Sequence, residues 1–73
     1  MEIKLISKDR ICDIELVLMS VQIRSKNYSV WVMLDKDNFV NAEIATDDLH
    51  EIIYSESSFE SMFPGVIKMA KAA

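Results

Sequence analysis

The sequence predicts an α+β fold, in which a four-stranded antiparallel meander is followed by two or three short helices packed on one face of the sheet. Short apolar, β-branched runs separated by polar stretches fill the first part of the chain, whereas helical spacing of apolar residues begins after Thr46. The chain has one glycine and one proline and therefore no evident linker. We expect a single domain, 1–73, with the β-meander in 1–45 and the helical cover in 46–73.

Two segments supply the first pair of strands. In residues 2–7, Ile3 and Leu5 alternate with charged residues, and Lys8-Asp9 is suited to a turn. Residues 11–24 carry two helical apolar stripes and would make a helix apolar on nearly all sides, so β-branched content and alternation favour a strand. Its apolar residues change from even to odd positions, which predicts a β-bulge in this second strand, within residues 17–20.

The register of the next hairpins decides which side chains share a face. A three-residue turn, 25–27, sets Trp31 and Met33 beside Val21 and Met19, and makes that face uniformly apolar. A turn at 35–38 then leads into the fourth strand. The face expected to lie beneath the helices holds Met19, Val21, Ile23, Trp31, Met33, Val40, Ala42 and Ile44.

The remaining third of the chain is expected to be helical. Thr46 is a good N-cap, and Asp47 and Asp48 would lie in the first turn, where carboxylates interact favourably with the helix dipole. Ser57 and Glu60 have the spacing of a capping box and predict a second start. Pro64-Gly65 predicts a kink or restart of the helix.

The opposite face of the expected sheet would carry an apolar stripe with a polar border. A chain this short has little sequence left to cover a second face, and exposed aromatic and aliphatic surface commonly marks an interface. The first strand or the carboxy-terminal tail folding over the stripe is the alternative. Docking of a second copy is the simplest form of the interface. The predicted protein-binding residues are Tyr28, Val30, Val32, Leu34 and Phe39.

Carboxylates are concentrated in the middle of the chain. Residues 35–60 contain eight of them and one lysine, so direct binding to nucleic acid is disfavoured. Carboxylates at helix starts and on solvated faces are also ordinary, which is the simpler interpretation. The alternative function is an acidic inhibitor from a phage or mobile element, of the anti-restriction or anti-CRISPR type, which mimics nucleic acid in a basic groove. The acidic face would consist of Asp35, Asp37, Asp47, Asp48, Glu51, Glu56 and Glu60.

Catalysis is not expected. Cys12 and His50 are the only residues of their types, and Cys12 lies in an apolar strand setting that does not activate a thiol. A small enzyme using Cys12 or His50 remains a second alternative. Asp35-Lys36-Asp37-Asn38 resembles the start of a calcium loop, but Phe39 and Val40 follow where an oxygen ligand and glycine are required. We therefore expect no metal, no nucleotide and no other cofactor.

The single cysteine and the absence of an export signal favour the cytoplasm. The longest apolar run, 16–19, is far shorter than the roughly 20 residues that cross a bilayer, so no membrane insertion is expected. The sequence thus predicts a non-catalytic protein-interaction module, a homodimer that binds or inhibits another protein.

Overall fold

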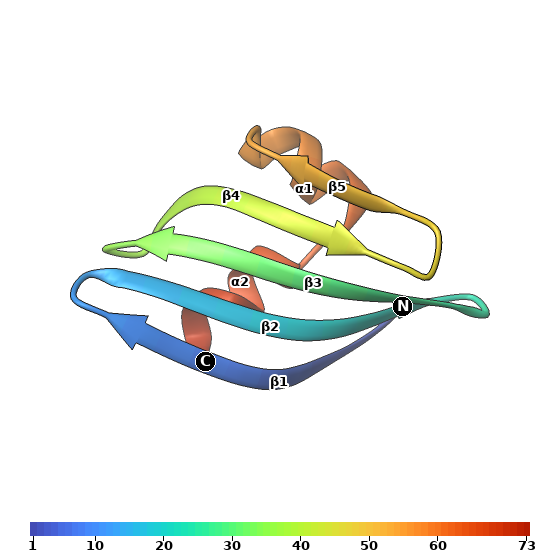
Figure 1. Ribbon diagram of the computed structural model, residues 1–73, viewed down its shortest axis with the longest axis horizontal. Coiled ribbons are helices and arrows are strands. Elements are labelled where there is room, and N and C mark those ends of the chain that lie inside the picture. The colour runs from blue at the N-terminus through green and yellow to red at the C-terminus, as the bar shows by residue number, and fades with distance from the viewer.

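The computed structural model describes all residues, 1–73, and consists of an antiparallel sheet followed by two helices (Figure 1). The sheet is a meander of five strands in the order β1-β2-β3-β4-β5, so each strand pairs with its neighbours in sequence. The strands are β1 (Glu2–Ile11), β2 (Ile14–Ile23), β3 (Lys26–Asp35), β4 (Asn38–Ala45) and β5 (His50–Ile53), and the helices are α1 (Glu56–Met62) and α2 (Val66–Ala72).

The first three connections are two-residue turns. The pairs Ile11/Ile14, Ile23/Lys26 and Asp35/Asn38 close them. A residue with positive φ lies in each: Cys12 at 56°, Arg24 at 58°, and both Lys36 and Asp37 at 51° and 67°. Positive φ at the central residues suits the right-handed twist of a hairpin. The turn expected at 35–38 is confirmed.

The three-residue turn expected at 25–27 is wrong, because the chain turns at Arg24 and Ser25 and pairs from Lys26 onward. This shifts the β2–β3 register, so that Val21 lies opposite Tyr28 and Val17 opposite Val32. The first strand is likewise longer than expected, since it continues through Lys8-Asp9 to Ile11.

The bulge predicted in the second strand is wrong. The β2–β3 ladder is continuous from Ile14 to Ile23, whereas the register shifts in β1 between Leu5 and Ser7. No bulge is needed in β2 because both of its faces are apolar: the odd residues lie beneath the helices and the even ones lie on the other side. A second shift, near Leu34, leaves Val40 of β4 without a partner.

The segment following Thr46 is a fifth strand and not the expected helix. His50–Ile53 pairs with β4, Ala45 facing His50 and Ala42 facing Ile53. The turn before it is closed by hydrogen bonds from the Thr46 amide to the Leu49 carbonyl (2.8 Å) and from the Thr46 hydroxyl to Asp48 (3.1 Å). The residues that resemble a helix start therefore form a turn, and the helical cover begins only at Glu56.

The two helices are short and separated by the predicted break. Ser55 is the N-cap of α1, and its hydroxyl accepts a hydrogen bond from the Ser58 amide (3.3 Å), so the expected Ser57–Glu60 capping box is wrong. Glu60 instead accepts a hydrogen bond from the Gly65 amide (3.0 Å) at the start of α2. Gly65 has φ of 88°, a left-handed conformation that suits glycine and allows the restart after Pro64.

Both helices pack on one face of the sheet, which we call the covered face. Phe59 and Phe63 are the aromatic centre of this layer, stacking on Phe39 (6.0 Å between ring centroids) and edge-on to Tyr28 (5.3 Å), respectively. The core between the two layers consists of Val17, Met19, Val21, Val30, Val32, Leu34, Ala42, Ile44, Ile53, Phe59, Phe63, Val66, Ile67 and Ala70.

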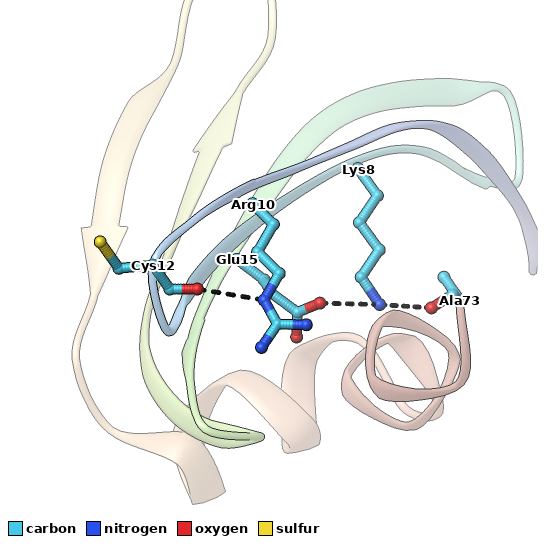
Figure 2. Close-up of polar contacts among 5 residues, drawn as sticks. All are labelled: Lys8, Arg10, Cys12, Glu15 and Ala73. Carbon is cyan, nitrogen blue, oxygen red and sulfur yellow. Dashed lines mark hydrogen bonds and ion pairs between the residues drawn. The ribbon is translucent and has the colours of Figure 1, made fainter.

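A polar contact fixes the last turn of α2 against the edge of the sheet (Figure 2). Lys8 lies 3.2 Å from the Glu15 carboxylate and also donates to the backbone oxygen of Ala73. A cation at the carboxyl end of a helix interacts favourably with the helix dipole. Arg10, next to this pair, donates to the Cys12 carbonyl (3.1 Å) and supports the β1–β2 turn. Charged groups thus border the covered face at this end of the sheet.

Candidate protein-binding surface

The other side of the sheet, which we call the open face, carries an apolar patch that no helix covers. Alternate residues of the central strands supply it, because Leu16 pairs with Met33 and Leu18 with Trp31. The pair Ile11 and Ile14 extends it to the first turn. We call these six residues the open-face patch: Ile11, Ile14, Leu16, Leu18, Trp31 and Met33.

The exposure of the patch contrasts with that of the core. Ile11 is 77% exposed and Leu16 is 37% exposed, while Trp31 and Met33 are half-buried by their neighbours within the sheet. Figure 1 looks onto this side of the sheet, with the helices lying behind it. The surface between the side chains is slightly hollowed at two places, one beside Trp31 and Asn41 and the other beside Ile14 and Asp9. Leu16 and Met33 line both hollows.

Polar residues border the patch on both sides. On β1, Asp9 lies opposite Leu16; on β4, Asn41 and Glu43 lie opposite Met33 and Trp31. Glu43 also contacts the His50 ring of β5, at 2.5 Å between Oε2 and Nε2. The patch therefore has an apolar centre and a polar margin.

The binding stripe predicted from the sequence is wrong in its position. Val30, Val32 and Leu34 are 0% exposed, and Tyr28 and Phe39 pack partly buried against the same core. These five residues lie beneath the helices and are not available to a partner. The physical reason is the shorter β2–β3 turn, which places the even residues of β3 beside the odd residues of β2 and directs both sets at the helices.

The residues expected beneath the helices divide between the two faces. Met19, Val21, Ala42 and Ile44 are in the core, with Ile23 packed at its margin. Trp31 and Met33 instead lie on the open face, and Val40 is exposed at the irregularity of β4. The sequence signal that could have identified the open face is the presence of polar residues on the same side of the sheet as Trp31. Once the register is known, these residues on β3 and β4 include Ser29, Asn41 and Glu43.

Cys12 and His50 lie at opposite ends of the sheet. Cys12 is exposed in the β1–β2 turn, not in an apolar strand, and His50 begins β5 after the connection at the other end of β4 (Figure 1). His50 contacts only the Glu43 carboxylate among charged groups. The fold does not bring the cysteine and the histidine together.

The seven acidic residues are exposed but do not share one helical face. Asp35 and Asp37 lie at one end of β4, and Asp47 and Asp48 lie at the other. Glu51 is on β5, and Glu56 and Glu60 are on α1. Glu60 and Asp48 accept local hydrogen bonds within the chain. No three His, Cys, Asp or Glu side chains gather in a group that could hold a metal ion.

Comparison of the chain with family models, with curated proteins and with solved structures finds no match. Neither helix has the length and apolar character required of a membrane span.

Proposed function

We propose that this protein is a small non-catalytic interaction module that binds another protein surface through the open-face patch. The observation that carries the proposal is the position of Trp31 and Met33, which lie in the middle of the sheet on the side that no other segment covers. A contiguous apolar surface rimmed by polar groups on a small protein usually marks an interaction site.

The composition of the patch supports this function. Trp and Met are enriched at the centres of interfaces, and a buried Trp is among the residues whose truncation costs the most binding energy. Trp31 is flanked by Leu18 on one side and by Glu43 on the other. A partner would therefore meet an aromatic anchor with an aliphatic side and a charged side, and the best fit is an apolar surface with cations at its margin.

A pair of matched variants tests the proposal. Leu16→Lys places a cation in the patch opposite Asp9, and Gln22→Lys places the same cation on the same strand and face, opposite Glu2, but away from the patch. Each new lysine has a cross-strand carboxylate, so both variants should fold. The wild-type chain and the two variants are immobilised and exposed to a cell lysate that also contains labelled copies of the chain.

We expect wild type and Gln22→Lys to retain the same protein, and Leu16→Lys to lose it. The retained protein should also shift the emission of Trp31, the only tryptophan, to shorter wavelength, since binding would remove this side chain from water. Retention that is equal in Leu16→Lys and wild type, with no change in Trp31 emission, would contradict the proposal.

A further inference from the structure

We propose that the partner on the open-face patch is a second copy of this chain, packed face to face about a two-fold axis that runs parallel to the strands between β2 and β3. This inference rests on the proposed function, because it names the occupant of the same surface. It is argued from the size of the face, the register of its apolar residues and the position of its charges.

The face has the size that a stable dimer requires. The molecule measures 36 × 22 Å along its two longest axes, and Figure 1 shows the sheet spread over this plane. Stable protein interfaces bury about 800 Å² on each partner. One open face placed on another is therefore of the right order, and two sheets packed in this way form a layer about 10 Å thick filled by side chains from both.

The register makes the patch self-complementary about this axis. Rotation places β2 of one copy over β3 of the other while keeping each residue at the same height along the strands. Because Leu18 pairs with Trp31 and Leu16 with Met33 within one sheet, Leu18 then covers the partner's Trp31 and Leu16 covers the partner's Met33. Each contact occurs twice, and every large residue at the centre of the patch meets an apolar one.

The charges at the margin are also complementary in this arrangement. The same rotation places β1 over β4 of the partner. Lys4 lies opposite Ser20, which is two residues along β2 from Leu18. Glu43 lies in the same cross-strand row as Leu18 and Trp31. Lys4 is thus within reach of the partner's Glu43. An axis perpendicular to the strands would instead set β4 over β4 and leave no cation beside Glu43.

The central experiment is sedimentation equilibrium from micromolar to millimolar concentration. Wild type should dimerise, and Lys4→Glu and Glu43→Lys should each weaken the dimer by about tenfold, since each reversal creates two like-charge contacts per dimer. The double variant Lys4→Glu with Glu43→Lys restores opposite charges and should recover most of the affinity. Lys68→Glu, an exposed reversal on α2, should leave it unchanged. Thermal unfolding of each variant at low concentration confirms that it is folded.

The outcomes separate this inference from the proposed function. A wild-type chain that stays monomeric at millimolar concentration, yet binds a foreign protein that Leu16→Lys cannot bind, would overturn the inference and leave the function standing. If neither single reversal changes the affinity of the dimer, or if the double variant lowers that affinity further, the proposed axis is wrong. A dimer that survives Leu16→Lys forms at another surface and would overturn the inference. The proposed function would fall with it only if Leu16→Lys also retains every protein that the wild-type chain retains.

Discussion

The two faces of the sheet are built from the same strands and from similar residues, but they meet different surroundings. On β3, Val32 and Leu34 are 0% exposed beneath the helices, while Trp31 and Met33, which alternate with them, remain partly in contact with solvent. The covered face meets Phe59 and Phe63, whereas the open face meets no segment of the chain. Apolar character alone therefore does not tell which face the helices cover, and the register decides it.

The largest effect should come from removing the aromatic centre of the covered face. Phe59 is 0% exposed and contacts both Phe39 and Phe63 through its ring. Phe59→Ala should lower the free energy of unfolding by about 3–5 kcal/mol, because a large cavity remains in the core. Urea unfolding at low concentration measures this loss. A loss below about 1 kcal/mol would mean that the helices do not hold this face as described.

A leucine on each face gives a matched comparison of the two surfaces. Leu34→Ala, on the covered face, should cost about 2–5 kcal/mol, while Leu16→Ala, which is 37% exposed on the open face, should cost about 0.5 kcal/mol in the monomer. Both residues lie on interior strands of the sheet, so the difference between their losses of stability reports whether helices cover the side chain. Denaturant unfolding measures the free energy of unfolding of each variant and should show a clearly larger loss for Leu34→Ala. Equal losses would contradict the assignment of the faces.

The break between the helices offers a smaller perturbation of the cover. Gly65 has φ of 88°, and a Cβ there would have no atom within 4 Å. Gly65→Ala should therefore cost only the backbone strain, about 1–2 kcal/mol, and leave the packing intact. Gly65→Asn should cost less, since Asn tolerates this conformation better. Thermal unfolding distinguishes them, and an Ala variant as stable as wild type would exclude a left-handed residue at this position.

The smallest effect is expected at the margin of the open face. His50 and Glu43 are 63% and 38% exposed, so their contact is screened by water. Glu43→Gln should change the stability of the monomer by less than about 1 kcal/mol. Unfolding measured at low and high salt checks this expectation, and a larger loss that salt does not reduce would show that the pair supports the sheet.

The meander, the turn at 35–38 and the break at Pro64-Gly65 could be predicted from the sequence because they depend on local patterns. The register could not. The turn at Arg24 and Ser25 places Arg24 at a positive φ of 58°, which is uncommon outside glycine and asparagine, so no residue type marked it. Without that turn, the expected β2 neighbours of Trp31 and Met33 were shifted by three residues, and the two faces of β3 were exchanged.

The fifth strand was missed for a similar reason. Thr46 and Asp48 resemble a helix start, and their side chains do form the local hydrogen bond that such residues favour, but it closes a turn. The fifth strand, His50–Ile53, has four residues, which are too few for the spacing of apolar residues to distinguish a strand from a helix. Its pairing with β4 makes it a strand. The sequence predicts that one apolar face of the sheet is left uncovered. It assigns the wrong residues to that face because the predicted register is wrong.

Thiol labelling of adjacent β3 positions tests the central claim most directly. In a Cys12→Ser background, Val32→Cys places a thiol on the covered face and Met33→Cys places one on the open face. In dilute protein, Met33→Cys should react quickly and Val32→Cys only at the rate of unfolding, and the Met33→Cys reaction should slow as the protein concentration rises. Equal slow labelling of both in dilute protein, or faster labelling of Val32→Cys, would contradict the account.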